Sequence, residues 1–231
     1  MSAITLYQFE MSPFCDKVRR VLKYKGLGYE VENVSLQQVQ FGYLKKLTPI
    51  GKLPVLSLNG TNIADSSAII AELEHQYPEK PLLPADKKQA ALVHFFEDWA
   101  DEGLYFNEVY LRFVLPSNAP EYAAMAAKED NALFAAIGKM VAPGMIAKQA
   151  KAQGIGRKSL AEVLSDLKKH FSHLSDWLEG QDYLVGDSLT LADISVASQL
   201  SCIVATPEGK GVAADYPRVS EWLQRVDGET V

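Results

Sequence analysis

The sequence has little cysteine, no long apolar run and no excess of basic residues. Its 231 residues include only Cys15 and Cys202 as cysteines, too few for a disulfide framework. Its apolar runs fall short of the ~18–20 residues needed to cross a bilayer. The opening MSAITLYQFE lacks the basic and apolar regions of a signal peptide. With a net charge of −6, nonspecific binding to nucleic-acid phosphates is not expected. We therefore expect a soluble, cytoplasmic protein.

The first 80 residues mix strand and helix patterns. A β-rich run opens the chain and stops before Ser12-Pro13, a favoured pair for a helix N-cap and first turn. The helical pattern that follows ends at Gly26, and a second β-rich run comes next. Asn59-Gly60 between two further β-rich runs predicts a hairpin, after which Ser66 or Ser67 caps a helix. The predicted order is β-α-β-α-β-β-α, a thioredoxin-like α/β arrangement.

The rest of the chain is predicted to be helical. Residues 79–85 are rich in proline and lack periodicity, so they are interpreted as a linker between an α/β domain, residues 1–78, and an all-α domain, residues 86–231. Residues 87–115 form one long helix or two. Residues 189–205 are apolar nearly all round, which predicts a buried helix.

Four motifs in a fixed order carry a family resemblance. SPFC follows the first strand, GKLPVL precedes the hairpin, ADSSAI begins a helix, and GDSLTLAD lies in the helical half. With these motifs the chain resembles the serine-type members of the cytosolic glutathione transferase superfamily. The resemblance implies glutathione as co-substrate and a homodimer. The long Ala-rich segment from residue 115 to 159 departs from the common family pattern and looks like the failed-axon-connections and metaxin subgroup.

The resemblance also implies a glutathione-binding site. In the family, the proline that matches Pro54 is cis, and the backbone of the residue before it, here Leu53, pairs with the cysteinyl part of glutathione. Ser66 would bind the γ-glutamyl carboxylate, Asp65 would face the ammonium group, and Lys52 would contact the peptide backbone. From the residues alone, an edge-strand proline, a plain helix cap and a solvated lysine remain alternatives.

Two residues of SPFC are candidates for catalysis. Ser12 replaces the nucleophilic first cysteine of a redox dithiol, which argues against disulfide exchange. In serine-type members the matching hydroxyl donates a hydrogen bond to the glutathione sulfur and so favours the thiolate. Cys15 lies about one turn into the helix, where the dipole and Lys17, Arg19 and Arg20 could lower its pKa. Its side chain is nevertheless expected to point into the packed layer, where small buried cysteines are common.

The helical half contributes a folding motif and a candidate pocket. Thr190 and Asp193 in TLAD form a predicted capping box, which serves folding rather than catalysis. Four aromatic residues are candidates for lining an apolar co-substrate pocket, with core packing as the alternative for at least half of them: Tyr105, Phe106, Tyr110 and Phe113. No metal site is expected.

These observations together predict a glutathione transferase that conjugates the glutathione thiolate to a small electrophilic, apolar substrate. Two alternatives remain from the sequence. One is a non-catalytic protein of the same fold that binds a protein partner. The other is a glutathione-dependent thiol reductase or peroxidase in which Cys15 forms a mixed disulfide.

Overall fold

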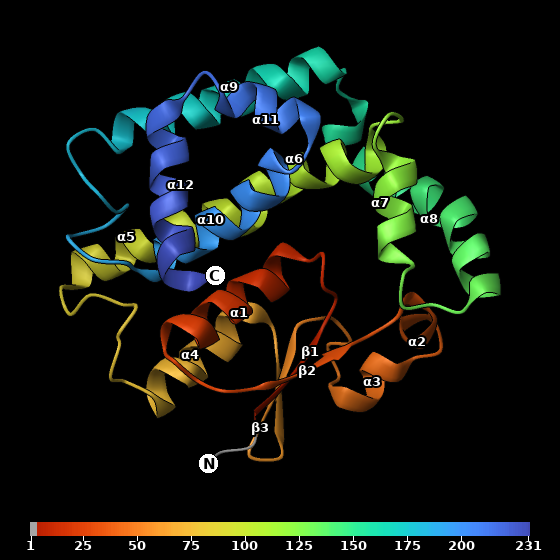
Figure 1. The fold of residues 1–231 in the computed structure, drawn as a ribbon, viewed down its shortest axis with the longest axis horizontal. Helices are drawn as coiled ribbons and strands as arrows, with labels where there is room; N and C mark the ends of the chain where they lie inside the picture. The colour runs from red at the N-terminus through yellow and green to blue at the C-terminus, as the bar shows by residue number, and fades with distance from the viewer. Residues whose placement is uncertain (1–3) are drawn as a thin grey trace.

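The N-terminal half is built on a four-stranded mixed sheet, seen in a computed structural model that describes residues 4–231 (Figure 1). The strand order is β2-β1-β3-β4. Strand β1 (Ile4–Gln8) runs parallel to β2 (Glu30–Asn33) and antiparallel to β3 (Val55–Leu58), which pairs with β4 (Thr61–Ala64) in a hairpin. The predicted thioredoxin-like arrangement is confirmed.

The helices of this half follow the predicted order, except that two short helices lie where one was predicted, between β2 and β3. They are α1 (Pro13–Tyr24), α2 (Leu36–Gln40), α3 (Tyr43–Leu47) and α4 (Ser66–Gln76). The hairpin turn is at Asn59-Gly60, where φ is 52° and 84°. Two consecutive positive φ angles match the type I′ turn that Asn-Gly favours, because Gly reaches this region without steric cost.

One uninterrupted helical run crosses the second half of the molecule. It consists of α5 (Lys87–Asp98), the π-helical turn η1 (Trp99–Leu104), α6 (Tyr105–Val109) and a second π-helical turn, η2 (Tyr110–Val114). The structure thus decides between one helix and two in favour of one. Each π-helical turn shifts the side chains that follow it around the helix axis, and such turns are frequent at functional sites.

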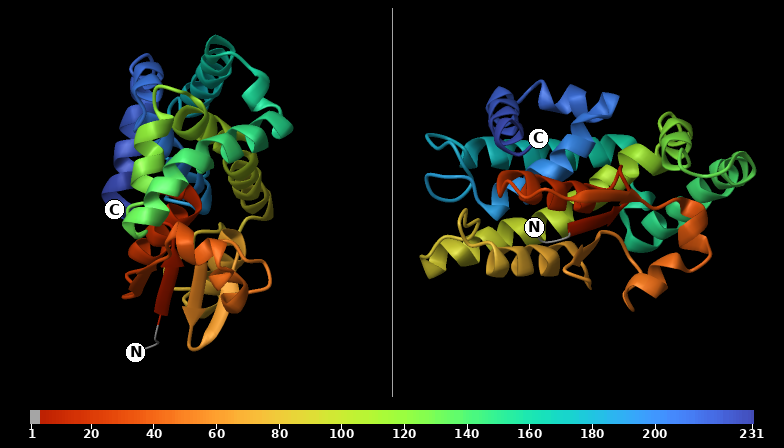
Figure 2. Two further views of the ribbon diagram at one scale, coloured as in Figure 1. Left: turned by 90° about the vertical axis from the view of Figure 1, so that its right-hand side faces the viewer. Right: turned by 60° about the horizontal axis from the view of Figure 1, so that its bottom comes forward.

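The remaining helices complete the second half of the molecule (Figures 1 and 2). They are α7 (Ala119–Ala126), α8 (Ala132–Gln153), the short 3₁₀ turn η3 (Ile155–Arg157), α9 (Leu160–Trp177), α10 (Leu191–Val204), α11 (Pro207–Ala213) and α12 (Pro217–Thr230). Helix α10 is buried along most of its length, as its apolar pattern predicts. In the described part of the chain, no helix is long and apolar enough to cross a membrane.

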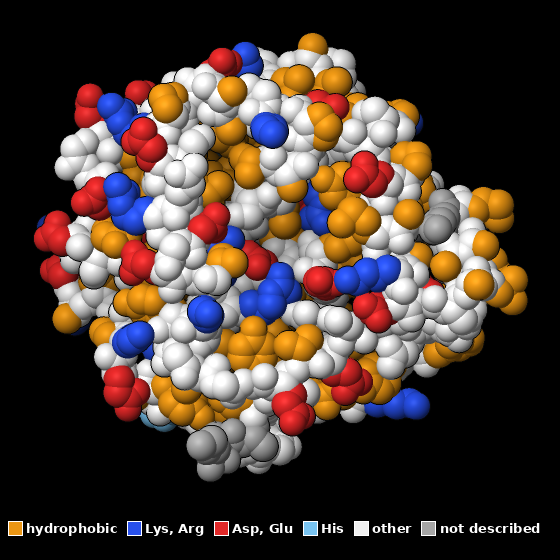
Figure 3. All heavy atoms as spheres, in the orientation of Figure 1, with side chains coloured by type: hydrophobic (Ala, Val, Ile, Leu, Met, Phe, Trp, Pro, Cys, Tyr) orange, Lys and Arg blue, Asp and Glu red, His pale blue; other side chains and the backbone are white. Residues whose placement is uncertain are grey.

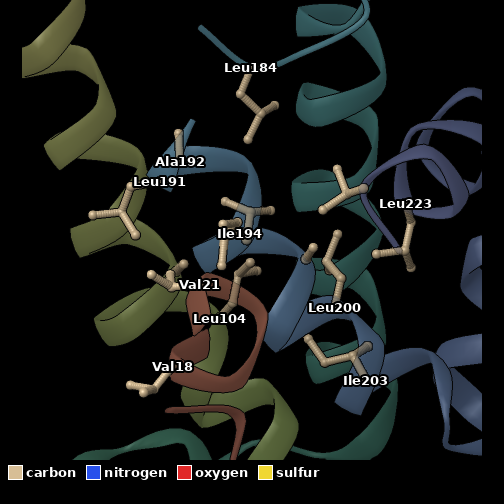
Figure 4. Packing of buried hydrophobic residues seen from close by; sticks show 14 of the residues in the cluster. Val18, Val21, Leu104, Leu184, Leu191, Ala192, Ile194, Leu200, Ile203 and Leu223 are labelled. Atoms are coloured by element: carbon tan, nitrogen blue, oxygen red, sulfur yellow. The ribbon is translucent and has the colours of Figure 1, made fainter. Parts of the chain in front are cut away.

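Helix α1 joins the two halves. Val18 and Val21 on α1 lie next to α10 and the η1 turn in the hydrophobic core, near Ile194 and Leu104 (Figure 4). Arg20, almost fully buried on the same helix, forms an ion pair with Asp227 of α12 at 2.7 Å. This apolar and ionic contact fixes the α/β half against the helical half along the middle of α1.

Candidate active site

Three of the four motifs meet at one end of the sheet. Tyr7 in β1 pairs with Val55 in β3, and Val55 pairs with Ala64 in β4. Because both pairings are antiparallel, the C-terminal end of β1, the N-terminal end of β3 and the C-terminal end of β4 lie at the same end of the sheet. The residues that flank these strands, Ser12, Leu53-Pro54 and Asp65, are therefore arranged along one end of the sheet.

Ser12 begins helix α1 as its N-cap. Its Oγ accepts a hydrogen bond from the backbone N–H of Cys15 at 3.4 Å. This contact uses a lone pair of the hydroxyl and leaves its proton free, so the cap and a donated hydrogen bond are compatible. Ser12 is also part of a cavity wall between the two halves. A ligand atom in that cavity would meet both the hydroxyl and the positive end of the α1 dipole.

The environment of Cys15 disfavours a thiolate. The side chain is fully buried, and this burial raises the pKa of the thiol to about 11, although hydrogen bonds at Phe9 and Ser12 oppose the rise. Of the basic residues expected to lower this pKa, Arg19 does act to lower it, but burial outweighs it. Lys17 is engaged elsewhere, in ion pairs with Glu97 and Asp101. Cys15 therefore has the character of a core residue.

Helix α4 begins one residue earlier than predicted. Its N-cap is Asp65, not Ser66 or Ser67, and Asp65 Oδ1 accepts from the backbone N–H groups of Ser67 and Ala68, both at 3.1 Å. Ser66 is the first residue of the helix and is buried. In the described part of the chain its hydroxyl forms no hydrogen bond. Its backbone N–H is one of the first N–H groups of a helix, which lack a partner within the helix.

A buried charge network holds the start of α4 against the helical half. Lys17 Nζ lies 2.7 Å from a Glu97 oxygen and 2.8 Å from an Asp101 oxygen, and the Ser67 hydroxyl donates to Glu97 at 2.6 Å. Burial acts to raise the pKa of Glu97, but Lys17 and Ser67 outweigh it and lower the pKa. Because Ser67 is fixed in this way, its neighbour Ser66 has a defined position.

The GKLPVL motif contains the cis peptide bond that the resemblance to glutathione transferases implies. The Leu53-Pro54 peptide is cis, and Pro54 is buried directly before β3. The strand pairing starts at Val55, so the backbone of Leu53 lies beyond the end of the ladder. Lys52 is exposed and lies at the rim of this end of the sheet.

Beside Ser12 lies an apolar cavity of about 250 Å³. Its wall comes from the loop before α1 and its first residue, the start of α2, α6, η2, α7 and α8: Phe9, Met11, Ser12, Pro13, Leu36, Tyr105, Phe106, Glu108, Val109, Arg112, Phe113, Ala119, Ala123, Ala126, Pro143, Ile146, Gln149 and Ala150. Three of the four candidate aromatic residues line it. The fourth, Tyr110, is packed in the core. The unusual segment after residue 115 thus supplies one side of the cavity.

The cavity wall contains an ion pair that was not predicted from the sequence. Glu108 and Arg112 are both buried and pair with each other. Arg112 Nη1 also donates to the backbone oxygen of Met11 at 3.0 Å, which connects the helical half to the loop that holds Ser12. Burial raises the pKa of Glu108 to about 7, although Arg112 opposes this rise. The available signal was a Glu and an Arg four residues apart in an otherwise aromatic and aliphatic helix.

Glu108→Gln is expected to change the pH dependence of stability. Because burial raises the folded-state pKa of Glu108 from 4.5 to about 7, the folded protein keeps a proton that the unfolded chain releases. The wild type should therefore lose free energy of unfolding as the pH rises from about 4.5 to about 7, and the variant should lack this loss. Urea unfolding at about pH 5 and about pH 8 measures it. Glu102→Gln, at an exposed position, is the control. Parallel pH profiles for wild type and Glu108→Gln would contradict the assignment.

The comparisons with known proteins agree with this geometry. Residues 6–81 match the glutathione S-transferase N-terminal domain, and residues 104–228 match the glutathione S-transferase C-terminal domain. The chain belongs to the glutathione S-transferase family. It is accordingly a transferase, and glutathione is its co-substrate.

Relatives match this transferase over nearly its full length. It is 26% identical to an isoprene-epoxide–glutathione S-transferase of Rhodococcus sp. (strain AD45), with 94% of this chain and 92% of the relative covered. It is 30% identical to glutathione S-transferase 1 of Dianthus caryophyllus, with 92% and 81% covered. A solved structure of a glutathione transferase homologue from Drosophila mojavensis with bound glutathione superposes with a TM-score of 0.68 at 25% identity, covering 100% of this chain and 92% of that one.

Proposed function

We propose that this transferase activates glutathione through Ser12, whose hydroxyl proton is free to be donated to the sulfur. The observation that carries this proposal is the position of Ser12, which is at once the N-cap of α1 and part of the apolar cavity wall. A hydrogen bond to the charged form lowers the pKa of a thiol. The nucleophile is the glutathione thiolate, and the protein thiol of Cys15 takes no part.

The start of α4 is proposed to hold the γ-glutamyl end of glutathione. A carboxylate suits the Ser66 hydroxyl and backbone N–H at the positive end of the helix dipole. Asp65 uses only one carboxylate oxygen as a cap, so the other is available for an ammonium group. The backbone of Leu53, turned by the cis bond to Pro54, is proposed to pair with the cysteinyl part, and Lys52 to contact the peptide backbone from the rim.

The second substrate is proposed to be a small apolar electrophile, such as an epoxide, in the cavity beside Ser12. The apolar wall and its volume of about 250 Å³ support a small, mainly hydrocarbon molecule. As the thiolate attacks the epoxide carbon, the C–S bond forms, the C–O bond breaks and the oxygen gains negative charge. The Arg112–Glu108 pair in the wall supplies a positive group for that oxygen, and solvent water supplies the final proton. The name of the Rhodococcus relative supports the same substrate class.

Small and large electrophiles are expected to react at different rates. We expect kcat/KM to be at least about tenfold higher for isoprene monoxide and other small aliphatic epoxides than for stilbene oxide, because two phenyl rings exceed this cavity. Mass spectrometry of the conjugates, with rates corrected for the uncatalysed reaction, measures this. Equal or reversed rates would contradict the proposed substrate class.

We further propose a cytoplasmic homodimer, with the domain boundary between residues 78 and 86. The family resemblance supports the dimer and the location. The positions of α4 and α5 support the boundary, since one ends at Gln76 and the other begins at Lys87.

A further inference from the structure

Helix α8 and the residues that follow it carry a charge opposite to that of the rest of the chain. Residues 131–161 contain five Lys or Arg residues and no Asp or Glu. The other 200 residues contain 18 basic and 29 acidic residues, a net charge of −11. One of the five, Lys158, pairs with Asp166 just beyond the segment at 2.6 Å. The remaining basic excess in an acidic protein attracts an anionic partner to this segment.

The same helix exposes large apolar side chains. Leu133 and Met140 are 72% and 78% exposed, and Ile137 and Met145 are also exposed. Phe41 of α2, likewise exposed, packs against Phe134 and extends this apolar region. Figure 3 shows hydrophobic side chains gathered at the right-hand end of the molecule, where α8 projects in Figure 1. Contiguous exposed apolar groups of this kind mark interaction sites.

The apolar and basic side chains follow one line along the helix. Leu133, Ile137, Met140, Gly144, Lys148 and Lys151 are separated by steps of three or four residues, which places them on one helical face. We call this line the outer face of α8. Pro143, Ile146 and Ala150 lie on the opposite side and line the cavity. Within the described residues, Lys148 and Lys151 form no salt bridge, and both are exposed.

We propose that the outer face of α8 binds the surface of an anionic phospholipid bilayer. Leu133, Ile137 and Met140 would enter the headgroup region, and Lys148 and Lys151 would contact lipid phosphates. Apolar side chains that enter the headgroup boundary and basic side chains that contact anionic lipids each strengthen binding to a membrane surface. The cavity that α8 lines lies on the other side of the helix. The outer face, as far as its residues are described, is the convex surface of a helix, which fits a flat bilayer better than it fits a peptide.

Vesicle sedimentation with the full-length protein tests the proposal. The wild type should bind vesicles of phosphatidylglycerol and phosphatidylcholine in equal parts, bind pure phosphatidylcholine vesicles far more weakly, and lose affinity at high salt. Lys148→Glu/Lys151→Glu should weaken binding at least about 25-fold, since each basic residue near such a surface contributes about fivefold. Leu133→Ser/Met140→Ser should weaken it comparably.

The matched control is Lys87→Glu/Lys88→Glu at the exposed start of α5, which changes the net charge equally. This control should still bind, and all variants should keep the melting temperature and the rate of glutathione conjugation. Absence of wild-type binding to the anionic vesicles would overturn the proposal, as would equal losses in the control. So would a wild-type dimer in light scattering that Leu133→Ser/Met140→Ser dissociates, because the outer face would then be a contact between copies.

Discussion

Ser12→Ala is expected to lower kcat/KM for conjugation about 10²–10³-fold while changing the glutathione dissociation constant little. Removal of one hydrogen-bond donor to a reacting anion has an effect of this size. The lost donor serves the thiolate rather than the bound tripeptide as a whole, so the effect falls on the rate. The pH profile of kcat/KM should also move upward, towards the pKa of about 8.5 of an unperturbed thiol.

Two further variants separate this role from its alternatives. Ser66→Ala should raise the glutathione dissociation constant about tenfold or more, because it removes a hydrogen bond to a charged group, and should leave the pH profile in place. Cys15→Ala should keep both the profile and the rate in the folded protein. Calorimetric titration gives the binding constants, and steady-state kinetics gives the profiles. If Ser12→Ala turned over normally and Cys15→Ala did not, a thiol mechanism would replace the one proposed here.

The local elements of the fold were predictable because their signals are short. Ser12-Pro13 specifies a helix start through an N-cap and a fixed φ, and Asn59-Gly60 specifies a turn through its positive φ angles. The apolar pattern of α10 specifies burial without reference to any other segment. Each of these signals depends on residues within a few positions of one another, so the sequence contains all the information needed.

The features missed in the site depend on contacts between distant segments. Asp65, Ser66 and Ser67 are all acceptable caps, and the outcome depends partly on the Ser67 hydroxyl, which donates to Glu97 in another domain. From the local sequence alone, Lys17 would be interpreted as a surface cation of a basic helix. Its buried ion pair is with Glu97, 80 residues away, which no local pattern indicates. The π-helical turns are not visible in a hydrophobic pattern with a period of 3.6 residues. Because these turns rotate the side chains that follow them, the side of the helix on which Glu108 and Arg112 lie cannot be predicted from that pattern.

The capping box after residue 189 shows how a local motif becomes a tertiary one. Asp193 is fully buried, and its carboxylate accepts the backbone N–H and the hydroxyl of Thr190, both at 2.9 Å. It also accepts the backbone N–H of Leu184 at 2.8 Å and the indole N–H of Trp222 at 3.0 Å. The predicted capping box accounts for the contact with the backbone N–H of Thr190. The contacts with Leu184 and Trp222 connect α10 to the preceding loop and to α12, so one side chain joins three segments of the helical core.

Asp193→Ala is therefore expected to cost about 3–5 kcal/mol of unfolding free energy, well above the ~1 kcal/mol of an ordinary cap. The substitution leaves the N–H groups of Leu184, Thr190 and Trp222 buried without acceptors, and each such group carries its full desolvation penalty. Thermal unfolding should show a drop in melting temperature of roughly 10 °C, because 1 kcal/mol corresponds to about 2–4 °C at this chain length.

The matched control is Asp187→Ala, at an exposed position in the same motif. This control should change stability by less than about 0.5 kcal/mol. Since Asp193 is not part of the cavity wall, the folded fraction should conjugate glutathione at the wild-type rate. A loss of turnover at an unchanged melting temperature would show that the carboxylate acts in catalysis and not in folding.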